Sequence, residues 1–487
     1  MRKNRRMPQQ SSRPPRRRRS LLGPVVAGLL IVALIFGSVW AIPAVLAETV
    51  AGEPGRPMTV VSVPTEQGKL HGVLDAAASP SENPGADDEV IQDIVSAELA
   101  GAPGSASVTV LDAQSGRVRA ERAAGEARIP ASNQKTLTAL TVAEHLDPYS
   151  RLATTVETGD DPHRITLVAG GDTLLAPGKG DPDAVNGRAG LEDLAERTAS
   201  ALTERGVQGE VTVSLDTSLF SGPALNPGWA TEDVVAGEIT AVSPLAMYSH
   251  RVPTPDGKDP GPRGERPDNA GEAAAGEFRD RLQDQLGTRA TVSAGEHARP
   301  EEAVELARVE SAPLHEQAAY MLEQSDNSLA ETLARVAARA AGEPGSVTGV
   351  QRAIRATLEA HSIDMAGADI IDASGMAVSN RVTTGLLAQA TRALLIDPDA
   401  GPYGQGLPLG GATGTLTDRF DDPDERAARG LTRAKTGTLN SVVSLSGYVQ
   451  QAGGEVLVYS VIFNDVQGQT GPARDTVDRT VATLAQG

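Results

Sequence analysis

The stretch Ile129-Pro-Ala-Ser-Asn-Gln-Lys135 places one serine, Ser132, three residues before a lysine. Apolar residues follow at roughly helical spacing as far as Leu146, which predicts a helix that begins near Pro130. On a helix, residues i and i+3 share one face, so the Lys135 amine can reach the Ser132 hydroxyl. A serine becomes a nucleophile when a base takes its proton. Lysine can be that base only if burial or a neighbouring cation destabilises its ammonium form.

Two further motifs follow in order, Ser325-Asp-Asn327 and Lys435-Thr-Gly-Thr438. The set S-x-x-K, S-D-N and K-T-G is the signature of penicillin-binding proteins and class A β-lactamases. Lys435 is a candidate for the cation that destabilises the Lys135 ammonium. Arginine could not replace Lys135, because a guanidinium does not lose its proton in proteins. The pattern is unusual in this chain, which has only six lysines, Lys3, Lys69, Lys135, Lys179, Lys258 and Lys435.

The segments around the second and third motifs have regular hydrophobic patterns. Residues 325–341 are predicted to form a helix, residues 431–450 a strand pair or one long strand, and residues 455–464 a buried strand. Taken alone, Ser325 would fit a helix N-cap and Asn327 a surface position. The three ordered motifs together favour a serine enzyme that works by acyl transfer.

A K-T-G motif on an edge strand can take part directly in such a reaction. It would present Lys435 to a substrate carboxylate and the Thr438 N–H to a developing oxyanion. Gly437 leaves room for the close approach of two backbones. The second oxyanion donor would be the N–H of Ser132 at a helix N-terminus.

At these residues the chain resembles the low-molecular-mass class C penicillin-binding proteins, the D-Ala-D-Ala carboxypeptidases/endopeptidases of peptidase family S13. The similarity extends over about residues 91–485. The stretches that carry it are residues 129–135, 309–314, 321–327, 330–331, 372–375, 380–383, 414–416 and 434–439.

The resemblance implies an α+β fold. We expect a β-lactamase/transpeptidase-like domain, an antiparallel sheet flanked by helices, with a large inserted region between the S-x-x-K and S-D-N motifs. Residues 91–150 and 311–487 would form the penicillin-binding catalytic domain, and residues 151–310 the inserted subdomain or subdomains. Class A β-lactamases, as a family, place the two motifs much closer together.

The expected insertion has its own predicted elements. Residues 164–168 and 210–215 are strand-like, whereas residues 191–205 and 270–286 have the pattern of amphipathic helices. Residues 251–269 are rich in proline, glycine and charge, which predicts a mobile loop.

The resemblance also implies a role for each motif residue. Ser132 would attack the penultimate carbonyl of a D-Ala-D-Ala end, or of a cross-link, in a peptidoglycan stem peptide and form an acyl-enzyme. Lys135 would be the base, Ser325 would relay a proton to the leaving amine, and Asn327 would hold the acyl amide. The terminal carboxylate would be bound by the K-T-G-T segment, that is by Lys435, Thr436, Gly437 and Thr438. β-Lactam antibiotics would acylate the same serine.

One departure from the family leaves specificity open. The family often has an S-R-x-N run after Asp-Gly-Ser-Gly-Leu, whereas this chain has Met376-Ala-Val-Ser-Asn380 there. If that arginine helps to bind the stem peptide's side-chain carboxylate, this chain lacks the contact. The sequence does not separate carboxypeptidase from endopeptidase action. Two alternatives remain: a β-lactamase-like hydrolase, for which no loop carrying a deacylating base is recognisable, and a catalytically weak wall-associated scaffold, against which the intact motifs argue.

The N-terminal residues predict the compartment. Residues 1–20 are basic without any acid, and residues 21–47 are apolar and long enough to span a bilayer. The basic flank would stay in the cytoplasm, which places the enzyme on the extracytoplasmic face of the cell membrane. Cleavage after Ala44-Val-Leu-Ala47, giving a secreted protein, is the alternative. Residues 48–90 have the composition of a flexible linker.

Composition excludes several other kinds of protein. The chain has no cysteine, so thiol catalysis and cysteine–zinc sites are excluded. Its seven histidines are scattered without metal-ligand spacing, and we expect neither metal nor cofactor. The net charge of −19 argues against a nucleic-acid partner.

Overall fold

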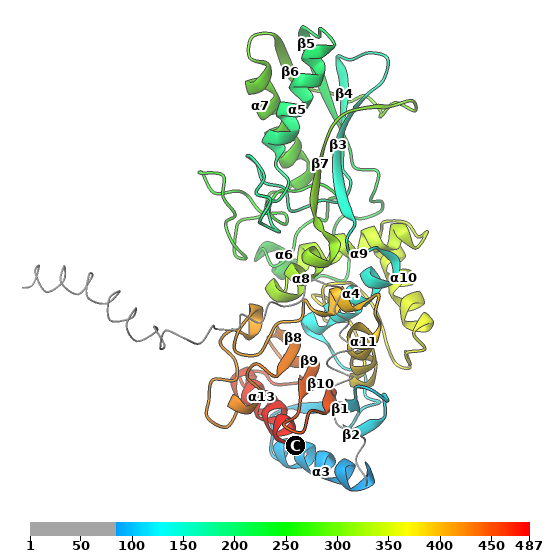
Figure 1. Cartoon of the computed structure of the whole chain (residues 1–487), viewed down its shortest axis with the longest axis vertical. Helices are drawn as coiled ribbons and strands as arrows, with labels where there is room; N and C mark the ends of the chain where they lie inside the picture. The colour runs from blue at the N-terminus through cyan, green and yellow to red at the C-terminus, as the bar shows by residue number, and fades with distance from the viewer. Residues whose placement is uncertain (1–83) are drawn as a thin grey trace, which may run out of the picture. The chain divides into compact units, whose positions relative to one another are not determined.

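The computed structural model describes residues 84–487. These residues form two five-stranded sheets, with helices around and between them (Figure 1). The strands are β1 (Ser105–Asp112), β2 (Val118–Arg122), β3 (Arg151–Thr158), β4 (Arg164–Val168), β5 (Gly209–Asp216), β6 (Ala290–Ala294), β7 (Val304–Pro313), β8 (Thr432–Leu439), β9 (Val442–Gln450) and β10 (Val456–Asn464).

The helices differ widely in length. The longer ones are α3 (Pro84–Glu98), α4 (Gln134–His145), α5 (Leu191–Glu204), α7 (Ala270–Leu286), α8 (Leu314–Gln324), α9 (Asn327–Ala340), α10 (Val347–Ala360), α11 (Thr384–Ile396) and α13 (Thr470–Gln486). The short helices and 3-10 turns are α6 (Thr231–Val235), α12 (Gly401–Gly404), η1 (Ala131–Asn133), η2 (Gly414–Leu416) and η3 (Arg426–Ala428).

The first sheet has the order β2-β1-β10-β9-β8 and is antiparallel throughout. Its central strand β10 is buried along its whole length. Side chains alternate between the two faces of a strand. In β10, Leu457, Tyr459 and Val461 therefore pack with α3 and α13, whereas Val458 and Ile462 face the cores that contain α11 and α4. Helices thus cover both faces of this sheet.

The second sheet has the order β6-β5-β4-β3-β7 and is mixed. β4, β5 and β6 are parallel, and β3 pairs antiparallel with both β4 and β7. Helices α5 and α7 bury leucine and phenylalanine side chains, such as Leu194 and Phe278, against Ile165 and Val213 of the sheet. The strand-like and helical patterns expected between residues 151 and 310 correspond to β4, α5, β5 and α7.

Figure 1 places α4, α8, α9 and α10 between the two sheets. β7 leads directly into α8, and β3 follows α4 after a short connection. The apolar faces of α4, α8 and α9 form one core through residues such as Leu137, Met321 and Leu333. The architecture confirms the predicted fold class: helices flank an antiparallel sheet, and a large region is inserted between the first and second motifs.

The structure bears on three expectations, which concern the helix at the second motif, the linker and the membrane span. The second motif does not open a helix at residue 325, because α8 ends there and α9 begins at Asn327. α3 begins at Pro84, so this end of the expected linker is helical. Within residues 84–487, no helix is long and apolar enough to cross a bilayer. The expected membrane span at residues 21–47 lies outside the described residues.

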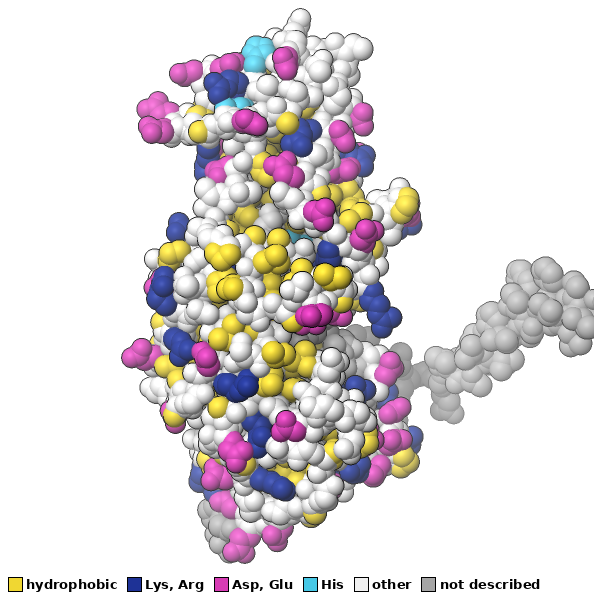
Figure 2. All heavy atoms as spheres, turned by 180° about the vertical axis from the view of Figure 1, so that it is seen from behind, with side chains coloured by type: hydrophobic (Ala, Val, Ile, Leu, Met, Phe, Trp, Pro, Cys, Tyr) yellow, Lys and Arg dark blue, Asp and Glu magenta, His cyan; other side chains and the backbone are white. Residues whose placement is uncertain are grey.

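On the face shown in Figure 2, acidic and basic side chains are interspersed. That face of the described residues has no broad basic area of the kind that binds the phosphates of nucleic acids.

Candidate active site

Ser132 lies in the turn η1, directly before α4. The residue before it, Ala131, has a φ of 49°, in the left-handed region that residues with a side chain rarely adopt. Gly375 packs against this turn so closely that a Cβ there would overlap the Ala131 carbonyl oxygen. Strain of this kind costs about 1–3 kcal/mol and persists only where the surrounding structure enforces it. The nucleophile position is therefore held rigidly.

The Lys135 amine is buried and has three oxygen acceptors. Its Nζ lies 3.0 Å from Ser132 Oγ, 2.6 Å from Asn327 Oδ1 and 2.7 Å from the Ser374 carbonyl oxygen. An ammonium group has three protons to donate, so each proton has a partner. The structure thus brings together the serine and lysine of the first motif and the asparagine of the second.

Burial lowers the pKa of Lys135 to about 8, against the opposing effect of the Asp372, Asp326 and Glu331 carboxylates. About a tenth of the amine is then neutral at pH 7. Of the two causes expected for this shift, burial and the charge of Lys435, burial is the main one. The pKa of Lys435 is itself lowered far below its usual value by burial and by the charge of Lys135.

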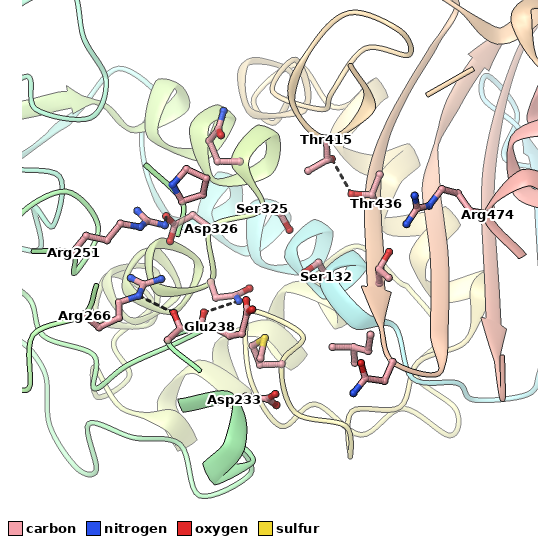
Figure 3. A pocket seen from close by; sticks show the side chains of 18 of the residues that line it. Ser132, Asp233, Glu238, Arg251, Arg266, Ser325, Asp326, Thr415, Thr436 and Arg474 are labelled. Atoms are coloured by element: carbon pink, nitrogen blue, oxygen red, sulfur yellow. Dashed lines mark hydrogen bonds and ion pairs between the residues drawn. The ribbon is translucent and has the colours of Figure 1, made fainter. Parts of the chain in front are cut away.

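The second motif forms a tight turn between two helices. Ser325 ends α8 in the left-handed conformation, with φ 54° and ψ 37°, and Asp326 caps α9 by accepting the Leu329 N–H at 3.0 Å. The turn places Ser325 in the same cleft as Ser132 (Figure 3). Within the described residues no group forms a hydrogen bond with the Ser325 hydroxyl, which leaves it available to a ligand.

Residues that lie between the first and second motifs in the sequence hold the Asp326 carboxylate in place. Ser249 Oγ donates to its Oδ1 at 2.7 Å, and Arg251 Nη2 donates to its Oδ2 at 2.7 Å. Arg266 lies near the same carboxylate and donates to the Ser249 carbonyl at 2.6 Å. Burial alone would raise the pKa of Asp326, but the guanidinium groups of Arg251 and Arg266 lower it. The carboxylate is ionised and is held by a buried ion pair.

Sequence reasoning missed these arginines. Arg251 and Arg266 lie at the two ends of residues 251–269, the stretch that was expected to be a mobile loop. The stretch has no helix or strand before Ala270, but its ends are anchored beneath the second motif. No local pattern identifies such a contact, because its partner Asp326 is distant in sequence.

Asn327 joins Lys135 to the region between the first and second motifs. Its Oδ1 accepts from Lys135, and its Nδ2 donates to the Glu238 carbonyl at 2.9 Å. A side-chain amide nitrogen carries two protons. One donor therefore remains for a group bound in the cleft.

The third motif lies on the edge strand β8, as predicted. Lys435 is buried and its Nζ donates to the Thr436 carbonyl at 2.9 Å, so its amine does not line the cleft. Thr436 and Thr438 do line it, and Thr436 Oγ1 donates to Thr415 Oγ1 at 2.8 Å. A Cβ at Gly437 would come within 3.0 Å of the Ser132 nitrogen and 2.9 Å of the Pro130 carbonyl. β8 and the nucleophile turn thus meet backbone to backbone.

These residues surround a cleft of about 560 Å³ (Figure 3). Ser132 and Ser325 lie in its middle. Thr415, Thr436 and Arg474 form one side, and Asp233 and Glu238 lie across from them. Within residues 84–487, no group of histidine and carboxylate side chains is suited to hold a metal ion. The arrangement offers a serine hydroxyl with a buried amine beside it, and a close backbone contact between the Ser132 turn and β8.

Comparison with known proteins assigns the chain to a protein family. The D-Ala-D-Ala carboxypeptidase 3 (S13) family profile matches residues 88–258 and 254–485. Carboxypeptidase DacB of Mycolicibacterium smegmatis is 34% identical over 385 residues, which cover 77% of this chain and 79% of that protein. The chain belongs to the S13 family. It is a serine-type peptidase hydrolase.

Two other proteins extend the comparison. A carboxypeptidase of Mycobacterium tuberculosis is 32% identical over 383 residues, covering 77% of this chain and 79% of that protein. The crystal structure of penicillin-binding protein 4 from Haemophilus influenzae matches with a TM-score of 0.63 and 18% identity, covering 81% of this chain and 99% of that one. The second likeness shows that the fold is shared.

The loop after Asp372 is where the sequence led us to expect a departure from the S13 pattern. Asp372 accepts hydrogen bonds from the Trp229 indole at 2.9 Å, from the Gly375 N–H at 2.9 Å and from Asn380 Nδ2 at 2.8 Å. Met376 lines the cleft, and Val378, where the family often has arginine, is 53% exposed. No arginine therefore reaches the cleft from position 378.

Sequence reasoning also missed a buried acid on α9. Glu331 Oε1 accepts the N–H groups of Ala373 and Ser374, both at 2.9 Å. Burial, together with the nearby Asp372, raises the pKa of Glu331 to about 7. Since the Ser374 carbonyl accepts from Lys135, Glu331 positions an acceptor of the Lys135 amine. Glu331 stood within a stretch that resembled the family, but no spacing rule marked its role.

Proposed function

We propose that this S13 peptidase is a D-Ala-D-Ala carboxypeptidase/endopeptidase that acts on peptidoglycan stem peptides through an acyl-enzyme on Ser132. The observation that carries the proposal is the contact between Lys135 Nζ and Ser132 Oγ, 3.0 Å apart, with the amine buried and its pKa lowered to about 8. Residues 91–150 and 311–487 form the catalytic domain, and residues 151–310 are the insertion.

Acylation begins when neutral Lys135 takes the Ser132 proton and the oxygen attacks the carbonyl carbon of the penultimate D-Ala. The N–H groups of Ser132 and Thr438 stabilise the oxyanion. The close approach of β8 to the nucleophile turn at Gly437 supports this pairing. Asn327 holds the acyl amide with its remaining N–H.

Collapse of the tetrahedral intermediate breaks the C–N bond. The proton held by Lys135 passes through the Ser325 hydroxyl to the leaving amine, and Ser325 has no competing partner within the described residues. Thr436 and Thr438 bind the carboxylate of the leaving group by hydrogen bonds. The buried Lys435 amine lies close enough to Lys135 for their charges to interact, and by donating to the Thr436 carbonyl it holds this segment of β8 in place without contacting the carboxylate. Water then attacks the acyl-enzyme, with Lys135 again as the base, and releases Ser132.

A β-lactam acylates Ser132 by the same steps, because its ring amide takes the place of the peptide bond and its carboxylate takes the place of the terminal one. The enzyme works outside the cytoplasm, where peptidoglycan is. We propose that residues 21–47 anchor it in the membrane and that residues 48 to about 83 are a linker.

Intact-protein mass spectrometry after incubation with penicillin tests the nucleophile. Wild-type protein should gain the mass of one penicillin, and Ser132→Ala should gain none. Ser115→Ala, in a turn outside the cleft, is the control and should react like the wild type. Release of D-Ala from a stem pentapeptide should follow the same pattern. Full labelling of Ser132→Ala would refute the assignment.

A second measurement tests the carboxylate site. Peptides that end in free D-Ala-D-Ala should react about ten- to a hundredfold faster than their C-terminal amides, since a hydrogen bond to a charged group is worth about 1.5–3 kcal/mol. Equal rates for the free acid and the amide would show that no carboxylate-binding site operates and would favour an esterase-like enzyme.

A further inference from the structure

The two sides of the cleft differ in their charged groups, because Arg251 and Arg266 on the side of Asp233 and Glu238 are engaged with Asp326 and with backbone carbonyls. Asp233 and Glu238 lie on one side, and Arg419 and Arg474 line the other, next to Thr436. Figure 3 shows Ser132 between Asp233 and Arg474. The arginine side is also the side of Thr436 and Thr438, where the carboxylate of the leaving group is placed. A leaving group that extends past that carboxylate along this side of the cleft would pass these arginines.

Arg419 already has a partner. It donates two hydrogen bonds to the buried carboxylate of Asp478, and its guanidinium lies 5.9 Å from the centre of the Phe420 ring. Asp478 is thereby engaged as well. This pair is a structural part of the cleft wall.

Arg474 is different. It lies in the first turns of α13 and is exposed, and it has no ion pair or hydrogen bond within residues 84–487. The helix itself is fixed, because Ala473, Val477 and Val481 are buried in the core against the first sheet. The nearest acids on its own helix are Asp478, which is held by Arg419, and Asp475, which is exposed. A guanidinium is thus presented to the cleft from a rigid element without being neutralised by contact.

We propose that Arg474 is a specificity residue that binds a second carboxylate on the leaving group. The inference rests on the proposed function. A free D-Ala leaving group has one carboxylate, which Thr436 and Thr438 bind, and nothing further for Arg474. The leaving group of a cross-link is a second stem peptide, a longer chain with additional carboxylates. Arg474 thus directs the enzyme toward cross-links and endopeptidase action.

Minimal substrates test this directly. Acyl-D-Ala–X peptides with one common acyl part would carry D-2-aminoadipate or its side-chain amide as X, so that they differ only in one charge. Wild-type enzyme should have a kcat/KM about three- to tenfold higher for the acid, the range of an exposed charge-assisted contact. Arg474→Gln should remove this preference and leave cleavage of acyl-D-Ala–D-Ala within about twofold of wild type. Arg429→Gln, at an exposed arginine outside the cleft, should keep the preference.

A charge exchange separates direct contact from a structural effect. Arg474→Glu should favour X = D-lysine over X = D-2-aminoadipate, whereas wild type should favour the reverse. Cleavage of a purified cross-linked stem dimer should fall in Arg474→Gln by about the same factor as the diacid substrate. Equal wild-type rates for the acid and its amide, or a preference that survives in Arg474→Gln, would overturn the inference. Failure of the wild type to release D-Ala or to bind penicillin would instead overturn the proposed function.

Discussion

The Lys135 amine is balanced between two opposing influences. Burial favours the neutral amine, and the three acceptors around Nζ favour the ammonium. The result is a pKa of about 8, close to the pH at which a general base is most effective. Both forms are therefore populated under ordinary conditions, which suits a group that must take a proton and give it away again.

This balance predicts the pH dependence of acylation. Only neutral Lys135 can take the Ser132 proton, and its population rises with pH, so the second-order rate constant for penicillin acylation should rise about tenfold per pH unit below pH 8 and level off above it. Mass spectrometric time courses between about pH 6 and about pH 9.5 measure it. Lys135→Arg should react at least about a hundredfold more slowly at every pH, because its guanidinium stays protonated. A flat wild-type profile would contradict the assignment of the base.

The ion pair between Arg251 and Asp326 predicts a large effect on stability. The two groups are 2.7 Å apart, with side chains 4% and 0% exposed. Arg251→Ala would leave a buried carboxylate without its main partner, which typically costs about 3–5 kcal/mol. We expect urea unfolding to show a loss of that size, together with slower penicillin acylation because Ser325 and Asn327 flank Asp326. Arg263→Ala, at an exposed arginine of the same loop, should change stability by no more than about 0.5 kcal/mol.

At the scale of elements, the contact between β8 and the nucleophile turn constrains the site closely. Gly437→Ala would press a methyl group against the Ser444 hydroxyl, which itself donates to the Pro130 carbonyl, and against the Pro130 carbonyl and the Ser132 nitrogen, so the strand must move away from the turn. We predict at least a tenfold loss of acylation rate while far-ultraviolet circular dichroism stays unchanged. Gly453→Ala, in the turn between β9 and β10 with no atom near its Cβ, should acylate like the wild type. Equal rates for the two variants would argue against an oxyanion site at β8.

The contact between α9 and the loop at Asp372 gives a prediction about stability and pH. Glu331 has a folded-state pKa of about 7, above its ordinary value in an unfolded chain, so the folded protein binds the Glu331 proton more tightly than the unfolded chain does. The stability that it contributes is present below about pH 4.3 and is lost as pH rises through about 7. Glu331→Gln stays neutral at every pH. Denaturant unfolding should therefore show the wild type gaining about 2–3 kcal/mol relative to Glu331→Gln between pH 8 and pH 5. A difference in unfolding free energy between the two proteins that does not change with pH would contradict the raised pKa of Glu331.

At the scale of the whole molecule, the region between the motifs is part of the active site. It supplies Ser249 and Arg251 to Asp326, the Glu238 carbonyl to Asn327, and the Trp229 indole to Asp372. We therefore expect the inserted region and the catalytic domain to unfold together. In a Trp40→Phe variant, Trp229 fluorescence and penicillin labelling should be lost at the same urea concentration. Labelling that outlasts the change in fluorescence would show two independent units.

The sequence predicted what depends on local pattern. β10 and α7 follow from apolar runs and helical spacing, and the approach of Lys135 to Ser132 follows from a three-residue offset. The rest depends on backbone atoms and on partners distant in the chain. The Ser374 and Glu238 carbonyls carry no side-chain signal, and Arg251 stood in a stretch whose composition indicated a loop. The burial of the Lys435 amine could not be predicted either, because it depends on how β8 packs.

The pairing of β1 with β10 has a consequence for the timing of folding. Ser132 is synthesised well before β10. β8 and β9 are connected to β1 only through β10, which is the last strand to be synthesised. A nascent chain that already contains Ser132, Lys135 and the second motif would still lack its oxyanion partner. Covalent labelling by a fluorescent penicillin during export should therefore begin only after β10 has paired with β1 and β9, and its onset would report when the sheet is complete.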